Sequence, residues 1–230
     1  MLVSIYGDSI LKSVVYENGA YHAQRDLVRQ FSERYDVEVD NRSYFGSTSA
    51  KALERLERDL SANKPLGKYC VIEFGGNDCA YDWEAVSAEP GGEHLPVTVP
   101  EVFRENLRRL LELVRSRCAV PVLTNLPPID AKKYFAWITR RLPSPDPILQ
   151  WIGRVERFYQ QNEFYSLLCA QVAAEFSAIF ADIRSPFLRE NDLDELLCED
   201  GMHPNREGHR RIFQVLCRLF EEKEGKCCEA

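Results

Sequence analysis

Four short polar segments of the sequence contain the residue types that acyl transfer uses. A serine hydroxyl becomes a nucleophile when an imidazole takes its proton and a carboxylate orients that imidazole. Ser9, His203 and Asp200 supply these three groups, and they predict a nucleophile, a general base and the partner of the base. The segments read Gly7-Asp8-Ser9-Ile10, Phe45-Gly46-Ser47-Thr48, Gly75-Gly76-Asn77-Asp78 and Asp200-Gly201-Met202-His203-Pro204-Asn205.

The same segments supply hydrogen-bond donors for a developing oxyanion. Ser9 falls at a predicted strand-to-helix turn, where its backbone N–H points outward and the helix dipole favours negative charge. Gly46 can offer a backbone N–H with no side chain in the way, and Asn77 can offer its side-chain amide. Removing one such donor typically costs about 10²–10³ in turnover. We therefore predict a three-donor oxyanion hole formed by Ser9, Gly46 and Asn77.

Each of these residues also has a purely structural interpretation. Asp8 or Ser9 is able to cap a helix, and Gly46 is a common type of turn residue. Asp200 is a possible N-terminal cap of the last helix, with His203 as a surface residue beside it. It is the conjunction of the four segments, more than any one of them, that favours a catalytic site.

A metal site is a weaker alternative for the last segment. Asp200, His203 and His209 are potential ligands, but no other His or Cys follows at persuasive ligand spacing. His22 and His94 have no such neighbours and are more typical of solvated loop or helix positions. The sequence predicts no metal and no organic cofactor.

The elements that must position these residues alternate between short apolar runs and helical patterns, which is typical of βαβ units. Apolar residues at spacings of three and four predict helices over residues 23–35, 48–60 and 206–222. A further helix, with a buried stripe from Phe103 to Val114, follows a capping box at residues 98–101. The apolar runs predict strands at residues 2–6, 37–39, 69–74, 120–126 and 178–183.

These elements predict a three-layer α/β/α fold of flavodoxin-like type with about five parallel strands. Ligands bind at the carboxyl ends of parallel strands, so the four polar segments are expected to meet at one edge of the sheet. They extend from Gly7 to Asn205, and no linker or repeat separates them. We therefore expect residues 1–230 to form one domain.

Two segments, at about residues 79–97 and 132–176, exceed ordinary loop length and are predicted to be insertions. Aromatic residues of the second segment would either pack as helix core or form an acyl-group wall or lid over the site. Trp83 and His94 of the first segment are further candidates to line that pocket. The aromatic residues concerned are Tyr134, Phe135, Trp137, Trp151, Phe158, Tyr159 and Phe164.

Composition excludes several classes of protein. With 45% hydrophobic and 28% charged residues, the chain of 230 residues has the composition of a folded protein. A net charge of −7 disfavours nucleic acid and anionic membrane surfaces as partners. Residues 1–6 are too short for a signal-peptide core and no membrane-length apolar run occurs, so we expect a cytoplasmic protein without stable membrane insertion. The eight cysteines, including Cys227 and Cys228, are then expected to be reduced thiols.

Taken in order, the four segments resemble the blocks of the SGNH, or GDSL-type, hydrolase superfamily. Residues 7–10 resemble its first block, with Ile10 in place of the usual Leu, and Gly46 with residues 47–49 resembles the second. Residues 75–78 and 200–205 are similar to the third and fifth blocks. The resemblance implies a lipase/acylhydrolase-like esterase. In it Ser9, His203 and Asp200 form the triad, and Ser9, Gly46 and Asn77 form the oxyanion hole.

On these grounds we expect a serine ester hydrolase that acts on a small-molecule O-acyl ester or thioester. Acyl transfer to an alcohol on the same scaffold, a catalytically idle ligand-binding protein and an interaction module are the alternatives. The Gly-x-Ser-x-Gly elbow of α/β-hydrolases is absent from the sequence. Acyl chain length, leaving group and oligomeric state are not predicted.

Overall fold

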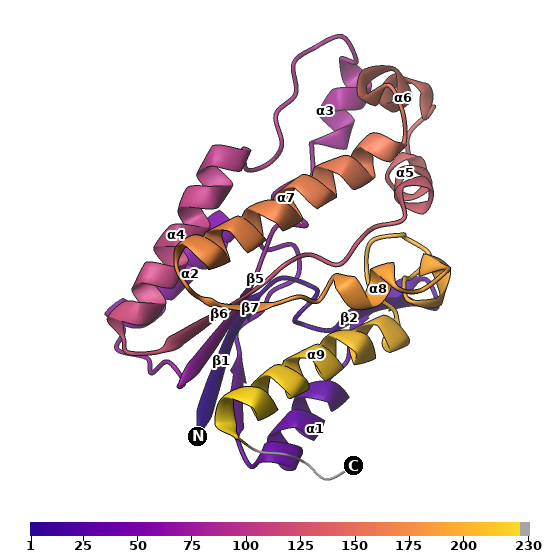
Figure 1. Ribbon diagram of the computed structural model, residues 1–230. Helices are drawn as coiled ribbons and strands as arrows, with labels where there is room; N and C mark the ends of the chain where they lie inside the picture. The colour runs from indigo at the N-terminus through magenta and orange to yellow at the C-terminus, as the bar shows by residue number, and fades with distance from the viewer. Residues whose placement is uncertain (226–230) are drawn as a thin grey trace.

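A parallel sheet of five strands, flanked by helices, forms the centre of the computed structural model, which describes residues 1–225 (Figure 1). The strand order is β4-β1-β5-β6-β7, and every neighbouring pair is parallel. This order is the flavodoxin-like one, so the predicted fold class is confirmed. The strands are β1 (Leu2–Gly7), β4 (Glu38–Asn41), β5 (Tyr69–Glu73), β6 (Val120–Thr124) and β7 (Ile179–Ala181).

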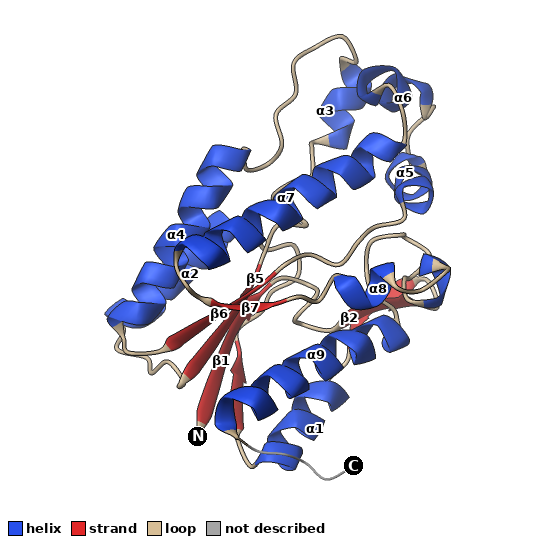
Figure 2. Cartoon of the chain, in the orientation of Figure 1, coloured by secondary structure: helices blue, strands red, loops and turns tan. Residues whose placement is uncertain are grey.

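Helices cover both faces of the sheet, as Figure 2 shows in blue around the red strands. One face packs on α2 (Ser49–Ser61), α4 (Pro100–Ser116) and α7 (Glu156–Glu175). The other face packs on α1 (Asp26–Tyr35), α8 (Ser185–Leu188) and α9 (Arg206–Glu224). The remaining short elements are α3 (Trp83–Ala88), α5 (Ala131–Thr139), α6 (Asp146–Ile152) and the 3₁₀ turn η1 (Leu193–Glu195).

The apolar stripe predicted for α4 is fully buried. Phe103, Leu107, Leu110, Leu111 and Val114 have no exposed surface, and they pack against the sheet in the same core as α2 and α7. The capping box predicted at its start is wrong. Val99 precedes the helix without a side-chain cap, while the Thr98 hydroxyl bonds to Asp78 instead.

A β-hairpin, β2 (Val14–Glu17) with β3 (Ala20–Ala23), stands apart from the main sheet. The prediction of a helix from residue 23 is wrong in its start, because the helix begins only at Asp26. Asn18 and Gly19 have φ values of 53° and 79°, which is the backbone of a tight hairpin turn. The hairpin places residues 14–23 beside the segment after β7 that carries Asp200 and His203.

Other predicted bounds differ by a few residues. The strands predicted at 69–74, 120–126 and 178–183 end earlier, at Glu73, Thr124 and Ala181, because the chain turns at the carboxyl edge of the sheet. The strand predicted at 37–39 runs to Asn41, and the last helix runs to Glu224. Cys227 and Cys228 lie outside the described residues, while Cys70, Cys79, Cys118, Cys169 and Cys198 are free thiols.

Residues 132–176 contribute to both the core and the carboxyl end of the sheet. Tyr165, Cys169 and Val172 of α7 are fully buried against the sheet. Tyr134 and Phe158 instead belong to a separate apolar cluster with α3 and α6. Phe164 is 44% exposed on α7. Part of the aromatic set is therefore core, as one of the two predictions had it.

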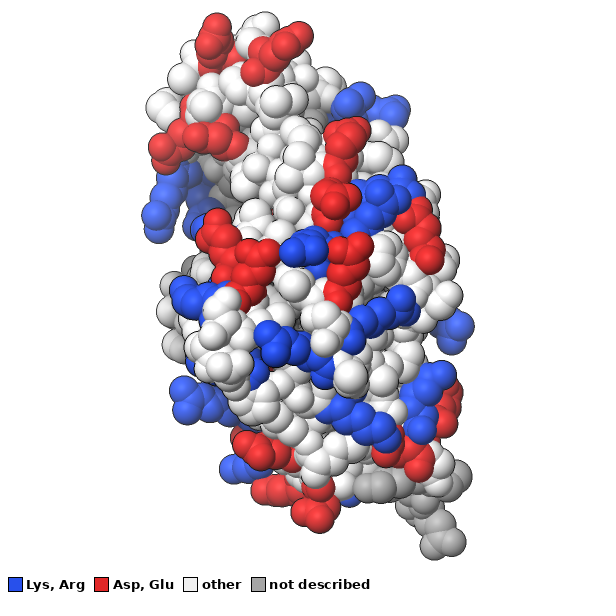
Figure 3. All heavy atoms as spheres, turned by 90° about the vertical axis from the view of Figure 1, so that its left-hand side faces the viewer, with Lys and Arg blue, Asp and Glu red and all other residues white. Residues whose placement is uncertain are grey.

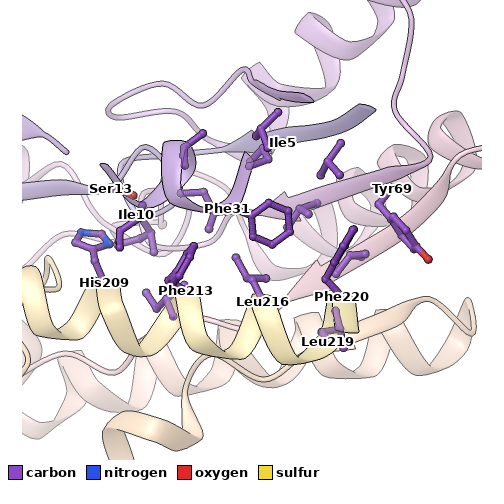
Figure 4. A pocket seen from close by; sticks show the side chains of 18 of the residues that line it. Ile5, Ile10, Ser13, Phe31, Tyr69, His209, Phe213, Leu216, Leu219 and Phe220 are labelled. Carbon is purple, nitrogen blue, oxygen red and sulfur yellow. The ribbon is translucent and has the colours of Figure 1, made fainter. Parts of the chain in front are cut away.

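An apolar cavity of about 90 Å³ lies inside the layer between the sheet, α1 and α9 (Figure 4). Ile5, Phe31, Phe213 and Leu216 are among its lining residues, and His209 lies at one end of it. On the outer surface of the molecule seen in Figure 3, basic and acidic side chains are interspersed. Within the described residues, no helix is long and apolar enough to cross a membrane.

Candidate active site

The carboxyl edge of the sheet brings three of the predicted residues into one chain of hydrogen bonds. His203 Nε2 lies 2.9 Å from Ser9 Oγ, and His203 Nδ1 lies 2.6 Å from Asp200 Oδ2. Ser9 follows β1, whereas the other two residues lie between β7 and α9, 194 positions from Ser9 for His203. All three side chains are buried, with Asp200 at 0% exposure. The arrangement can move a proton from the serine hydroxyl to the imidazole.

Ser9 sits in a series of turns and not at the start of a helix as predicted. The Asp8 carboxylate accepts a hydrogen bond from the Ile10 N–H, and the Lys12 N–H donates to the Asp8 carbonyl. The chain then enters β2, where the Val14 N–H donates to the Ser9 carbonyl. No helix dipole therefore acts at Ser9, since residues 9–13 form turns.

Asp200 is held as a carboxylate by donors on both of its oxygens. The backbone N–H groups of Met202 and His203 donate to Oδ1, each at 3.0 Å. Burial alone would raise the pKa of Asp200, but the hydrogen bonds and charge of His203 and the backbone donors lower it below its ordinary value. The carboxylate is thus able to stabilise a positively charged imidazole.

Gly201 makes the turn between Asp200 and His203 possible. Its φ is +69°, a conformation that favours glycine, and an added Cβ would lie 2.6 Å from Lys133 Cβ and 2.7 Å from the Tyr134 nitrogen. The helix cap, which was the structural alternative for Asp200, is made by Asn205, which accepts from the N–H groups of the first turn of α9. Asp200 therefore does not cap α9, and its carboxylate bonds to His203.

The predicted oxyanion donors lie close to one another at the ends of β1, β4 and β5. Neither Ser9 nor Gly46 uses its backbone N–H in a hydrogen bond with another described residue. Gly46 has a φ of +68°, and no atom lies within 4 Å of the position of a Cβ there. The Asn77 amide donates to Asp8 Oδ2 at 2.9 Å and to the Ser47 carbonyl at 3.1 Å.

Asp8 links Asn77 to a buried glutamate at the end of β5. The Asp8 N–H donates to Glu73 Oε2 at 3.3 Å, and both side chains are almost completely buried. Burial and the neighbouring Asp8 carboxylate raise the pKa of Glu73 well above its ordinary value. Burial raises the pKa of Asp8 as well, so the two neighbouring carboxyl groups disfavour a second negative charge at this place.

Two aromatic rings, those of Phe45 and Tyr21, lie against the His203 imidazole, and neither was predicted to have a role. The Phe45 ring stacks on the imidazole with centroids 5.8 Å apart, and the Tyr21 ring lies 5.0 Å from it. The Tyr21 hydroxyl donates to Asp200 Oδ2 at 3.0 Å. The Asn-Gly pair at 18–19 is a strong signal for a hairpin turn, and it would have placed Tyr21 on a strand.

A cavity of about 290 Å³ opens next to the site, between β5, β6 and helices α3, α5, α6 and α7. Ile10, Gly76 and Met202, which line it, are the chain neighbours of Ser9, Asn77 and His203. Trp83 and His94 line it as well, together with Tyr134, Trp151 and Phe158. Some of the aromatic candidates from residues 132–176 therefore line this cavity, namely Tyr134, Trp151 and Phe158. The others do not line it, namely Phe135, Trp137, Tyr159 and Phe164.

The remaining histidines lie outside the hydrogen-bond chain from Ser9 to Asp200. His22 is exposed on β3, and the His94 ring contacts the Glu89 carbonyl at 2.8 Å. His209 is buried and donates to the Val14 carbonyl at 2.9 Å. Among the described residues, no group of three His, Cys, Asp or Glu side chains is placed to hold a metal ion.

Comparison with known proteins shows the family of the chain. Residues 5–211 match the model of the GDSL-like lipase/acylhydrolase family. The chain belongs to this family. Membership places the chain among the hydrolases of ester bonds, as the motifs predicted.

Curated relatives and solved structures of this kind cover nearly the whole chain. The rice GDSL esterase/lipase WDL1 is 24% identical over 99% of this chain and 80% of its own length. A bovine isoamyl acetate-hydrolyzing esterase 1 homolog is 28% identical over 96% of this chain and 82% of its own length. The lipase/acylhydrolase structure from Enterococcus faecalis aligns over 100% of this chain and 99% of that one, with 21% identity and a TM-score of 0.68. A variant of the acetyl xylan esterase Axe2 from Geobacillus stearothermophilus aligns over 100% and 97%, with 19% identity and a TM-score of 0.65.

Proposed function

We propose that this protein is a serine ester hydrolase in which Ser9, His203 and Asp200 act as a catalytic triad. The observation that carries the proposal is the continuous hydrogen-bond chain from Ser9 Oγ through the imidazole to Asp200, with distances of 2.9 and 2.6 Å. His203 takes the proton of Ser9 as the hydroxyl attacks the acyl carbonyl. It then gives that proton to the leaving alcohol, and a water activated by His203 releases the acyl group.

The N–H groups of Ser9 and Gly46 and the amide of Asn77 are the proposed oxyanion donors. The two backbone groups are unused within the described residues and therefore available to a developing negative charge. The Asn77 amide becomes available when its bond to the neutral Ser47 carbonyl is exchanged for one to the oxyanion. A charged acceptor forms the stronger hydrogen bond, which favours the exchange in the transition state.

The cavity beside the site is the proposed acyl pocket. It touches the chain neighbours of Ser9, Asn77 and His203, and four aromatic rings from α3, α5, α6 and α7 wall it. These rings offer apolar contact to an acyl group, while Arg157 places a charged side chain on the same wall. The acyl groups of the substrate class are carried by oxygen or sulfur, as in simple esters, acetylated sugars and thioesters. The relatives named for isoamyl acetate and acetyl xylan favour small O-acyl esters within this class.

The test is hydrolysis of p-nitrophenyl acetate by the purified protein and by Ser9→Ala. In a subtilisin-type hydrolase, loss of the nucleophile costs about 10⁶ in turnover, so we expect activity to fall to the background rate. Ser61→Ala is the matched control, because the Ser61 hydroxyl is exposed on α2 and bonds only to the Glu57 carbonyl. A fluorophosphonate probe should label the wild type and Ser61→Ala but not Ser9→Ala. Equal rates in wild type and Ser9→Ala would refute the proposal.

A further inference from the structure

The side chain of Tyr21 contacts both the acid and the base of the proposed triad. Its hydroxyl donates to Asp200 Oδ2 at 3.0 Å, and the same oxygen lies 2.6 Å from His203 Nδ1. Its ring lies 5.0 Å from the imidazole. Tyr21 belongs to β3, which is not part of the main sheet. The contact therefore comes from an element that the fold of the sheet does not require.

The hairpin that carries Tyr21 is fastened to the segment that carries the triad acid and base. The Tyr16 N–H donates to Cys198 Sγ at 3.3 Å, and Arg206 bonds Glu17 through two nitrogens at 2.8 and 2.9 Å. These two contacts lie on either side of Asp200 in the sequence. The hairpin and the 198–206 segment thus form one unit, in which the Tyr21 hydroxyl bonds to Asp200.

We propose that Tyr21 is a positioning residue, which holds the Asp200 carboxylate and limits how strongly that carboxylate attracts the imidazole proton. The proposal rests on the triad proposed above. With two donors on Oδ2, the carboxylate cannot rotate without breaking a bond, so the imidazole stays aligned with Ser9. The second donor also shares the negative charge that would otherwise act on His203 alone.

The charges around Tyr21 agree with a donating hydroxyl. Burial and the Asp200 charge raise the pKa of Tyr21 above its ordinary value, against smaller opposite effects of Arg140, the residue after α5, and of Trp137 on α5. Tyr21 is therefore protonated over the whole range in which an esterase is assayed.

Other titratable groups that act on His203 stay in place when Tyr21 is changed. Asp8 from the turn after β1 and His209 from α9 both interact with the imidazole electrostatically. Ser9 contacts its Nε2, and Asp200 contacts its Nδ1. A change of Tyr21 to Phe removes only the hydroxyl donor, so a shift in the pH profile is attributable to that hydroxyl.

The experiment compares the pH dependence of kcat/KM for wild type and Tyr21→Phe with p-nitrophenyl acetate. Without the hydroxyl, Asp200 holds the imidazole proton more tightly, so activity is lost at a higher pH as the solution is acidified. We expect the acid limb to move up by roughly 0.3–1 pH unit. We expect kcat to fall about tenfold while KM changes less than about twofold.

Tyr16→Phe is the matched control. Tyr16 lies on the same hairpin, its ring is 4.8 Å from that of Tyr21, and its hydroxyl has no hydrogen-bond partner among the described residues. We expect an unchanged acid limb in this variant. A structural role of the hairpin alone would lower activity in either variant without moving the limb.

A double variant separates action through Asp200 from a general loss of structure. In Asp200→Asn the carboxylate charge is gone, so adding Tyr21→Phe should change kcat by less than about twofold. The low-field proton NMR signal of the His203 Nδ1–H···Asp200 bond, measured without substrate, should shift in Tyr21→Phe and stay in Tyr16→Phe. An unmoved limb with an unmoved signal overturns the Tyr21 proposal. An inactive wild type with a shifted signal would instead count against the proposed hydrolase function and leave Tyr21 as a partner of Asp200.

Discussion

The side-chain amide of Asn77 already makes two hydrogen bonds within the protein. Its amide donates to the Asp8 carboxylate and to the Ser47 carbonyl, so both of its hydrogens have acceptors before any substrate arrives. The Asp8 bond fixes the direction of the amide, because Asp8 is itself held by the N–H of Ile10. The Ser47 bond is the one that yields to an oxyanion. Asn77 is in this way pre-oriented at the cost of one neutral hydrogen bond.

Asn77→Ala tests this role. Without the amide the oxyanion loses one donor, and we expect kcat for p-nitrophenyl acetate to fall about 10²–10³-fold with little change in KM. Asn191→Ala, at an exposed position of the chain, is the control and should retain wild-type kcat. A fall of less than about threefold in Asn77→Ala would show that the two backbone N–H groups suffice.

The residues of the site could be predicted from the sequence to different degrees. Ser9, Asp200 and His203 stand in glycine-bearing segments at strand ends, and the structure brings them together. Tyr21 was missed, since a tyrosine in an alternating polar and apolar run has no chemical signature of its own. Phe45 was quoted with the glycine segment, but its stack on His203 depends on how the loop after β4 folds back.

At the scale of elements, apolar periodicity predicted the helices that pack on the sheet. The β2–β3 hairpin depends instead on its local turn. The helices α2, α4 and α9 appear within a few residues of their predicted bounds, because their apolar stripes face the sheet. The β2–β3 hairpin was not predicted, and only its last residue, Ala23, fell within the helix predicted over residues 23–35. The Asn18-Gly19 turn, in which both residues take positive φ, folds residues 14–23 into this hairpin.

The start of α4 was likewise decided by a contact with a residue distant in sequence and not by the local pattern. Thr98 satisfies the spacing of a capping box, yet its hydroxyl bonds to the buried Asp78. Asp78 also accepts from the N–H and the hydroxyl of Ser49 at the start of α2. A buried carboxylate needs several donors, and it draws in side chains that the local pattern assigns elsewhere. The sequence of residues 98–101 alone therefore could not predict that Thr98 bonds to Asp78.

The helices α3 and α6 make a testable contribution through the acyl pocket. Trp151 of α6 lines the cavity, and its ring lies 4.8 Å from Tyr81 and 5.5 Å from His94. In Trp151→Ala we expect kcat/KM for p-nitrophenyl hexanoate to fall about tenfold, because a longer acyl chain loses apolar contact area in the pocket. For the acetate ester, which reaches less of the wall, we expect a change below about threefold.

Phe164→Ala is the control for Trp151→Ala. Phe164 is 44% exposed on α7 and is not part of the cavity wall. Both esters should be hydrolysed by this variant as by the wild type. An equal loss for acetate and hexanoate in Trp151→Ala would mean that the cavity does not receive the acyl chain.

At the scale of the whole molecule, the site depends on the complete sheet. Ser9 leaves β1 in its interior, whereas Asp200 and His203 follow β7 at one edge. The hairpin and α9 bridge this distance, since His209 of α9 bonds to the first residue of β2. We infer that the chain acts as one domain, in which the first and last segments of the fold must both be in place before the triad exists.

His209 makes this bridge sensitive to acid. Burial lowers its pKa from 6.5 to about 4, against a smaller opposite effect of its bond to the Val14 carbonyl. Between these two pH values the unfolded chain binds a proton at this position and the folded chain does not. The free energy of unfolding therefore falls as the pH drops from 6.5 towards 4. At pH 5 the loss from this group amounts to about 2 kcal/mol.

His209→Gln removes this titration and leaves an amide to donate to the Val14 carbonyl. Urea unfolding at pH 7 and pH 5 gives the difference in the free energy of unfolding for each protein. We expect that difference to be about 2 kcal/mol smaller in the variant than in the wild type. The contribution of Glu73, which has a raised pKa and the opposite sign, is common to both and cancels. His22→Gln, exposed on β3, should match the wild type. The same pH dependence in His209→Gln and wild type would mean that the acid sensitivity arises outside the contact between α9 and β2.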